Sequence, residues 1–255
     1  MSQIDFNILR NPEMADDEAR HTVQIVNDYS GGENMDYLSE PHVACCLLVD
    51  TSGSMQANGK IQQLNEALRN FKETVCRDPL SRMRVDICVI AFATDVTIVT
   101  PFCPIMQFEP PTLYASGATS MGKGIRFALE AVHEEVRKYH GAGVECFKPF
   151  VLMITDGYPT DDIEGIADLI AAREGQGRYG HLRFHAFGVK GADMALLARL
   201  TKRVLAINMN AFDEIFNWTS RTLQIISHSK TSDNITGANL TSNMYVYTGS
   251  VPWDD

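Results

Sequence analysis

CCLLVDTSGSM, residues 45–55, is the stretch that decides how the chain folds. It joins an apolar run to Asp50 and then to two serines, Ser52 and Ser54, with Gly53 between them. An apolar run followed by a turn of small residues predicts a buried strand that ends at Asp50. The turn then places one carboxylate and two hydroxyls at the carboxyl edge of a sheet, where ligands bind in open α/β folds. Such oxygen donors suit a hard cation such as Mg²⁺.

Strand and helix patterns alternate from residue 43 to residue 228. The alternation predicts an α/β fold with a doubly wound, mostly parallel, six-stranded sheet and helices on both faces. The expected strands cover residues 43–49, 83–93, 96–100, 150–156, 182–189 and 204–207. The expected helices cover residues 60–76, 121–140, 163–174, 194–200 and 211–228. A tight turn at Thr94-Asp95 makes a hairpin, which gives the sheet one antiparallel edge strand.

Two local signals refine this pattern. Pro101 and Pro104 predict irregular chain directly after the hairpin, because proline cannot donate a ladder hydrogen bond. Asp161 and Asp162 are placed to cap the helix expected at residues 163–174.

Three parts are expected along the chain. Residues 1–40 form an acidic N-terminal extension, residues 41–228 the α/β domain, and residues 229–255 a polar C-terminal tail. The extension holds nine acidic and two basic residues, so it carries −7 of the formal net charge of −10. The tail is rich in Ser, Thr, Asn and Gly, a composition that disfavours a core of its own.

Charge and cysteine content bound the class of partner and the compartment. A net charge of −10 argues against nucleic acid and anionic membrane as partners. No basic and apolar leader opens the sequence, and no apolar run approaches the ~20 residues of a membrane span. The six cysteines form no C-x-x-C pair. We therefore expect buried thiols in a reducing, cytoplasmic setting, with neither a disulfide framework nor a zinc site.

Two further loops join the first at the carboxyl edge. One carries Thr119, and the other carries Asp156 at the end of a second apolar run. With Asp50, Ser52 and Ser54 they give two carboxylates and three hydroxyls, a plausible octahedral site for Mg²⁺, or for Mn²⁺ or Ca²⁺. The hydroxyls are neutral, so the cation keeps positive charge and can accept an anionic oxygen from outside the protein.

These residues resemble a known family. DTSGS, residues 50–54, is similar to the D-x-S-x-S motif of von Willebrand factor A (vWA) domains, and the resemblance covers residues 41–228. Thr119 and Asp156 match the other two positions of that family's metal-ion-dependent adhesion site. The resemblance implies that the three hydroxyls contact the metal and that Asp50 and Asp156 bind it directly or through water. A Glu or Asp of a protein partner would then fill the open position.

Within the family, KPFVLMITDGYPTD, residues 148–161, looks like the TerY branch. This is a bacterial, cytosolic group named from tellurite-resistance gene clusters. SGATS, residues 116–120, is similar to that branch as well, although Ala118 stands where a second glycine is common. The resemblance implies a stress or phosphorylation-signalling role. Its partner would be a Ser/Thr-kinase-like protein or a PP2C-type phosphatase.

The same residues allow two other interpretations, a helix cap and a phosphate-binding loop. An isolated D-x-S-x-S is more often a turn and helix cap than a metal loop, and Thr119 and Asp156 tip the balance toward metal. GATSMGKG, residues 117–124, nearly matches the phosphate-binding pattern G-x-x-x-x-G-K-[ST]. However, Gly124 replaces the residue whose hydroxyl would hold Mg²⁺, and the chain before Gly117 reads as loop where that motif follows a strand.

Catalysis finds little support in the pattern. None of the seven histidines falls on the three loops, so Ser52 and Ser54 have no evident general base. We therefore expect a non-enzymatic, metal-dependent protein-interaction module. The alternatives are a Mg²⁺-dependent hydrolase of phosphate esters or nucleotides, and an assembly scaffold that acts through the extension and the tail.

Overall fold

The computed structural model describes residues 39–175, 182–208 and 211–250, which fold around one seven-stranded sheet. The strands are β1 (Val43–Asp50), β2 (Val85–Phe92), β3 (Val96–Pro104), β4 (Phe150–Thr155), β5 (Arg183–Gly188), β6 (Val204–Ile207) and β7 (Met244–Val246). They lie in the order β3-β2-β1-β4-β5-β6-β7. The five strands from β2 to β6 in this order are parallel, while β3 and β7 pair antiparallel at the two edges. The predicted α/β class and the mostly parallel sheet are confirmed.

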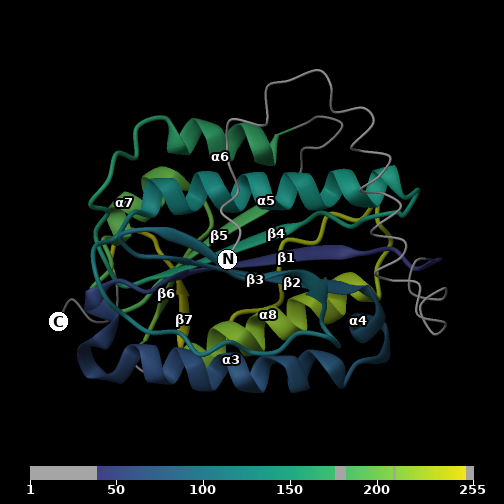
Figure 1. Cartoon of the computed structure of the whole chain (residues 1–255), viewed down its shortest axis with the longest axis horizontal. Helices are drawn as coiled ribbons and strands as arrows, with labels where there is room; N and C mark the ends of the chain where they lie inside the picture. The colour runs from purple at the N-terminus through teal and green to yellow at the C-terminus, as the bar shows by residue number, and fades with distance from the viewer. Residues whose placement is uncertain (1–38, 176–181, 209–210, 251–255) are drawn as a thin grey trace.

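Helices cover both faces of the sheet (Figure 1). They are the 3-10 segment η3 (Gly53–Gly59) and the α-helices α3 (Lys60–Cys76), α4 (Pro79–Arg84), α5 (Met121–Gly141), α6 (Ile166–Glu174), α7 (Met194–Leu200) and α8 (Phe212–Ser227). Figure 1 shows α5, α6 and α7 on one face, with α3, α4 and α8 on the other. Alternate residues of β1 therefore enter two separate cores, one with α3 and α8 and one with α5. No helix in the described ranges is both long and apolar enough to cross a membrane.

The edge strand β3 is longer than the sequence pattern predicts. It was expected to stop at residue 100 because of Pro101 and Pro104, yet it continues through both prolines. Its pairing with β2 shifts register between Val89 and Ile87, opposite this stretch. A proline is tolerated at an edge or a bulge because no ladder hydrogen bond depends on its missing N–H.

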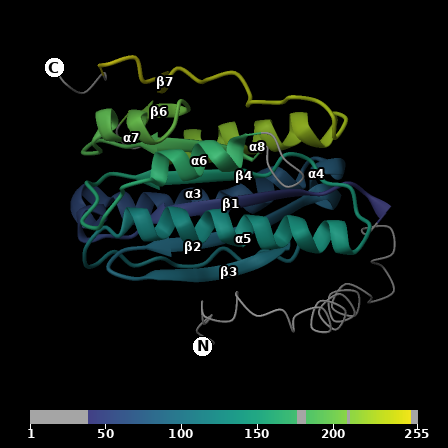
Figure 2. The ribbon, with the colours of Figure 1, turned by 90° about the horizontal axis from the view of Figure 1, so that it is seen from above.

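The predicted sheet of six strands gains a seventh from the polar tail. Met244 pairs with Ile207 and Val246 with Leu205, so β7 extends the sheet beyond β6. Before β7, the tail crosses α8: Trp218 donates its indole Nε1–H to the carbonyl of Ala238 at 2.9 Å. Figure 2 shows this C-terminal segment, in yellow, running alongside α8. The tail is therefore packed onto the domain as far as β7. Of the acidic extension predicted at residues 1–40, residues 1–38 lie outside the described residues.

Candidate functional site

The site lies at the carboxyl edge of the sheet, where three loops meet. Asp50 is the last residue of β1, and Asp156 follows the last residue of the neighbouring parallel strand β4. Thr119 lies just before α5. The first and second loops are joined by backbone hydrogen bonds, from the Gly53 amide to the Gly117 carbonyl at 3.0 Å and from the Ser116 amide to the Thr51 carbonyl at 2.8 Å.

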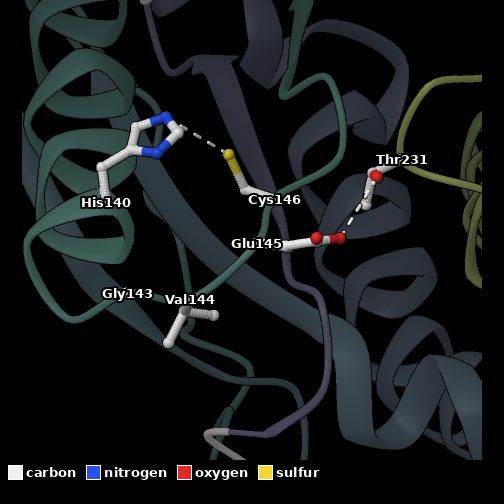
Figure 3. Close-up of a pocket in the computed structure, with 6 residues that line it drawn as sticks. All are labelled: His140, Gly143, Val144, Glu145, Cys146 and Thr231. Carbon is white, nitrogen blue, oxygen red and sulfur yellow. Dashed lines mark hydrogen bonds between the residues drawn. The ribbon is translucent and has the colours of Figure 1, made fainter.

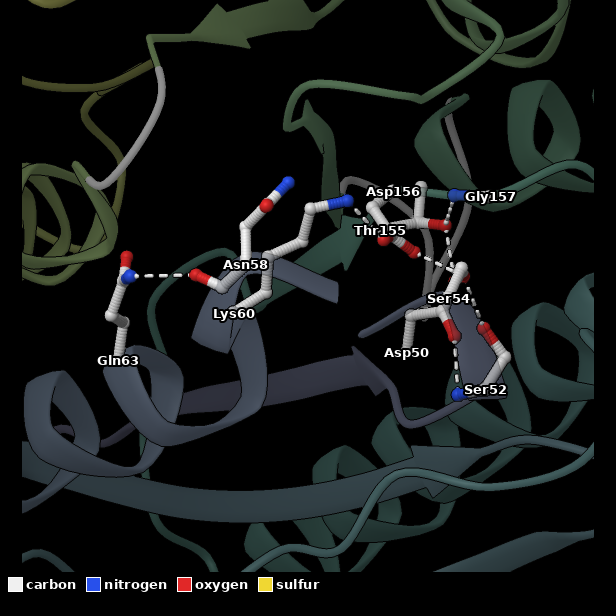
Figure 4. A network of polar contacts seen from close by, with 9 residues as sticks. All are labelled: Asp50, Ser52, Ser54, Asn58, Lys60, Gln63, Thr155, Asp156 and Gly157. Atoms are coloured by element: carbon white, nitrogen blue, oxygen red, sulfur yellow. Dashed lines mark hydrogen bonds and ion pairs between the residues drawn. The ribbon is translucent and has the colours of Figure 1, made fainter. Parts of the chain in front are cut away.

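A chain of hydrogen bonds links four of the predicted residues (Figure 4). Asp50 accepts from the Ser52 amide at 2.8 Å through Oδ1 and from the Thr155 hydroxyl at 2.6 Å through Oδ2. The Ser52 and Ser54 hydroxyls lie 2.9 Å apart. Ser54 in turn donates to Asp156 Oδ1 at 2.6 Å. The two carboxylates are therefore connected through the two serines.

Gly157 shows that Thr119 belongs to the same cluster. A Cβ atom added at Gly157 would lie 3.3 Å from Thr119 Oγ1 and 3.5 Å from both Asp50 Oδ2 and Ser54 Oγ. Three oxygen atoms from the first and second loops therefore face one small space on the third loop, which the absence of a side chain at Gly157 leaves free. The structure brings all five predicted residues together.

Burial destabilises the charged forms of the two carboxylates. Asp50 and Asp156 are both buried, whereas Ser54 is exposed and opens the cluster to solvent. Burial raises the pKa of Asp50; hydrogen bonds from Ser52 and Thr155 oppose this shift, and the charge of Asp156 adds to it. Two buried carboxylates in one cluster favour a cation beside them, because an uncompensated buried charge is strongly destabilising.

One such cation is supplied by the chain itself. Lys60, the first residue of α3, pairs its Nζ with Asp156 Oδ2. Lys60 was not among the predicted site residues. Its position offered a signal, because a lysine in the first turn of a helix faces the positive end of the helix dipole. A lysine placed there indicates a compensating carboxylate elsewhere.

The loop after β4 also holds Thr119 in place. The Thr160 amide donates to the Thr119 carbonyl at 2.9 Å, and the Thr119 amide donates to Thr160 Oγ1 at 3.0 Å. Asp161 accepts from the Gly122 and Lys123 amides at 3.1 and 2.8 Å. The loop that carries Asp156 is thus tied to the loop that carries Thr119.

The role of Asp161 differs from the one expected. It was predicted to cap a helix beginning at residue 163, but α6 begins at Ile166, after Gly165, with no side-chain cap. Asp161 instead caps α5, the helix that begins within the near match to a phosphate-binding loop. A phosphate at this helix start would therefore have to displace the Asp161 carboxylate from the amides of Gly122 and Lys123.

The donor set decides which kind of metal fits. Across the described ranges, no three His, Cys, Asp or Glu side chains gather as a metal cluster. The cluster at the carboxyl edge consists of two carboxylates and three hydroxyls. Oxygen-only donors of this kind fit Mg²⁺, Mn²⁺ or Ca²⁺ and disfavour soft metals.

A hollow of about 320 Å³ opens elsewhere, beside the C-terminal end of α5 (Figure 3). Cys146 Sγ lies 3.8 Å from His140 Nε2 there, a pairing that suggests a nucleophile and its base. Burial, and then the charge of Glu145, raise the pKa of the Cys146 thiol to about 11. The thiol therefore stays protonated near neutral pH and is a poor nucleophile. Glu145 is turned toward Thr231, which donates to its Oε2 at 3.3 Å.

Comparison with known proteins agrees with the fold. Residues 46–220 match the family model of the von Willebrand factor type A domain. No curated protein sequence matches the chain. Similar solved structures include the pilus adhesin SpaC from Lactobacillus rhamnosus GG, with a TM-score of 0.55 and 15% identity over 72% of this chain and 31% of that one. A von Willebrand factor type A protein from Catenulispora acidiphila has a TM-score of 0.54 and 16% identity, over 72% of this chain and 43% of that one. The PilB minor pilin from Streptococcus sanguinis has a TM-score of 0.50 and 11% identity, over 74% of this chain and 63% of that one.

At these identities the structural likeness shows the fold alone, and the chain spans less than two thirds of each of these three proteins. The family model is the stronger finding, because it covers well over half of the chain. Its match begins inside β1 and ends inside α8, so it includes all three loops of the site. The chain therefore belongs to the von Willebrand factor type A domain family.

Proposed function

We propose that this vWA domain is a metal-dependent protein-interaction module. Its five site residues would hold Mg²⁺, or Mn²⁺ or Ca²⁺ in its place: Asp50, Ser52, Ser54, Thr119 and Asp156. A bound divalent cation supplies a positive position that an Asp or Glu of a partner protein can complete. The observation that carries this proposal is the convergence of two carboxylates and three hydroxyls beside Gly157, at a point that Ser54 leaves open to solvent.

Two exposed tyrosines on the site loops support a protein as the partner. Tyr158 follows Gly157 directly and is 63% exposed, and Tyr114 is 81% exposed. The loop of Tyr114 is held against the first loop, where Gln56 donates to the Ala115 carbonyl at 2.6 Å. Tyrosine is enriched among the residues that carry binding energy at protein interfaces. A partner that reaches the metal would therefore meet an aromatic rim.

The resemblance of residues 148–161 to the TerY branch supports a narrower proposal. The protein would act in a bacterial stress or phosphorylation-signalling system linked to tellurite-resistance gene clusters. Its partner would be a Ser/Thr-kinase-like protein or a PP2C-type phosphatase. A cytoplasmic location fits the six cysteines, all of which are free thiols. The adhesin and pilin structures share only the fold and lend no support to a role in adhesion.

We also propose that the module has no catalytic activity of its own. The Ser52 and Ser54 hydroxyls bond to one another, and Ser54 donates to Asp156, which are the contacts of a ligand cluster. The hydrolase alternative predicts turnover of p-nitrophenyl phosphate or ATP that disappears in Asp50→Ala. Metal-dependent turnover of that kind would replace the binding proposal with an enzymatic one.

The test begins with the metal alone. Calorimetric titration of the full chain with Mn²⁺ is expected to show one site, which Asp50→Ala abolishes. Asp95→Ala is the matched control, because Asp95 is an exposed aspartate on the β2–β3 turn. The same three proteins, immobilised, are then exposed to lysate of the native cell with Mg²⁺ or with EDTA. A partner retained equally under all these conditions would refute the metal-bridged mechanism.

A further inference from the structure

Lys60 is placed to act on the metal site without being one of its ligands. Its side chain is 12% exposed, and that of its partner Asp156 is 0% exposed. Figure 4 shows the Lys60 side chain reaching toward Asp156 on the side away from Ser54. Each oxygen of Asp156 thus has its own partner, Ser54 at Oδ1 and Lys60 at Oδ2.

The lysine is also enclosed by a fourth loop. A Cβ atom added at Gly191, between β5 and α7, would lie 3.6 Å from Lys60 Nζ and 2.9 Å from the Asp156 carbonyl oxygen. Gly191 has a φ of +111°, a conformation that side chains rarely adopt. The close approach of this backbone keeps the ammonium beside Asp156.

We propose that Lys60 is a built-in competitor of the metal, an inference that rests on the proposed metal site. The two carboxylates and the ammonium give the cluster a net charge of −1. A divalent cation brings it to +1, and one carboxylate of a partner brings it to 0. Without Lys60, the metal alone would neutralise the cluster, and a partner's carboxylate would meet no net positive charge.

Like-charge repulsion sets the direction of the effect. A metal that uses Asp156 shares a carboxylate with Lys60, and two cations this close repel each other in a poorly solvated cluster. Lys60 therefore weakens the binding of metal alone and leaves the loaded site ready for an anionic oxygen. Metal and partner then raise each other's affinity, because linkage is reciprocal.

A purely structural role for Lys60 predicts the opposite sign. If the ion pair only holds the third loop in place, its removal would loosen the ligands and weaken metal binding. Mn²⁺ affinity thus separates the two roles.

The experiment measures Mn²⁺ affinity of the full chain by calorimetry. Lys60→Met is expected to tighten Mn²⁺ binding about tenfold, because it removes a positive charge that shares Asp156 with the metal. Lys60→Arg keeps the charge and is expected to stay near wild type. Lys72→Met is the matched control on the same helix, since Lys72 pairs with the exposed Glu109 far from the site loops.

A second readout is thermal stability, measured in EDTA and with Mn²⁺. In EDTA, Lys60→Met is expected to melt at a lower temperature than wild type, because Asp156 is left buried and uncompensated, and Mn²⁺ is expected to restore more stability to it than to wild type. Equal or weaker Mn²⁺ binding by folded Lys60→Met, with wild type binding normally, would overturn the role of Lys60 alone. Absence of Mn²⁺ binding in wild type and Lys60→Met alike would overturn the metal site itself.

Discussion

Two buried aspartates on neighbouring strands, Asp50 and Asp86, have opposite surroundings. Asp50 ends β1 at the carboxyl edge, and Asp86 lies near the start of the adjacent parallel strand β2, toward the amino edge. Asp86 Oδ2 accepts from His42 Nδ1 at 2.9 Å and from the Tyr139 hydroxyl at 2.5 Å. Asp50 receives one backbone amide and one threonine hydroxyl, and shares its cluster with the carboxylate of Asp156.

The difference separates a structural carboxylate from a binding one. Asp86 is met by an imidazole and a phenol supplied by the chain, so its environment is complete without any ligand. At the carboxyl edge, two carboxylates lie in one cluster, and its lysine pairs with Asp156. The same residue type at equal burial can therefore serve stability or binding. What distinguishes the two is that His42 and Tyr139 are buried with Asp86, whereas the cluster of Asp50 reaches solvent at Ser54.

The largest expected effect comes from removing Asp86. Asp86→Ala deletes the acceptor of both His42 and Tyr139, and we expect unfolding free energy to fall by about 3 kcal/mol. Mn²⁺ affinity should remain at the wild-type value, because the site lies at the other edge. Urea unfolding in EDTA and Mn²⁺ titration measure the two quantities.

Asp50→Ala is expected to have the opposite effects on stability and on Mn²⁺ binding. It should abolish Mn²⁺ binding and cost less stability in EDTA than Asp86→Ala, since it also relieves repulsion with Asp156. If both variants lost metal binding equally, the separation between a structural and a binding aspartate would fail.

A second prediction places acid sensitivity away from both aspartates, at His185 on β5. This imidazole lies among Phe150, Phe187 and Trp218. Burial, and then the charge of Arg203, lower its pKa to about 3. In the unfolded chain the His185 imidazole has a pKa of about 6.5, so as pH falls the unfolded state takes up the proton before the folded state does. The stability that neutral His185 provides is therefore full above pH 6.5. It is lost as pH falls toward 3, by at most about 1.4 kcal/mol per pH unit.

Urea unfolding in EDTA at pH 7, 6 and 5 tests this prediction. His185→Phe keeps the ring stack and is expected to lose about 2 kcal/mol less than wild type between pH 7 and pH 5. The exposed His140, changed to Gln, serves as the control and should follow wild type. If His185→Phe lost as much unfolding free energy as wild type between pH 7 and pH 5, His185 would not be the source of the acid sensitivity.

The smallest expected effect is on Mn²⁺ affinity alone and comes from a change at Gly157. Gly157→Ala keeps all five proposed ligands but puts a methyl group against Thr119, Asp50 and Ser54. The φ of Gly157 is not positive, so alanine fits the backbone, and stability should change by less than about 1 kcal/mol. We expect Mn²⁺ affinity to fall about tenfold, equivalent to about 1.4 kcal/mol.

Gly53→Ala is the control for the alanine change. Its Cβ would meet the Gly117 carbonyl at 3.4 Å, away from the ligand oxygens, so Mn²⁺ affinity should be retained. Unaltered Mn²⁺ binding by Gly157→Ala would show that the space beside Gly157 is not where the metal lies.

Much of the fold was predictable because its signals are local. The bounds of α3, α7 and β6 match the sequence pattern, since each has clear apolar spacing and a turn at its ends. The strand β7 was missed because three residues in a polar segment have no periodicity. It forms only because β6 presents an edge with which to pair.

The site divides in the same way. Its five proposed ligands were recognisable because Asp, Ser and Thr recur at the ends of apolar runs. Lys60 and Asp161 were missed or misassigned because their partners lie 96 and 38 residues away along the chain, respectively. Contacts at such separation depend on which strands become neighbours, and no local pattern records that.

The strand β7 also has a consequence for how the protein is synthesised. A chain leaves the ribosome from its N-terminus, so β6 and Trp218 emerge before the segment that covers them. Until Val246 has been made, the nascent domain has an open apolar strand edge, which is a hazard for aggregation. Once β7 pairs, the strand edge on this side of the sheet is only three residues long. Pairing of β7 therefore determines when, during translation, the β6 edge can no longer pair with other chains.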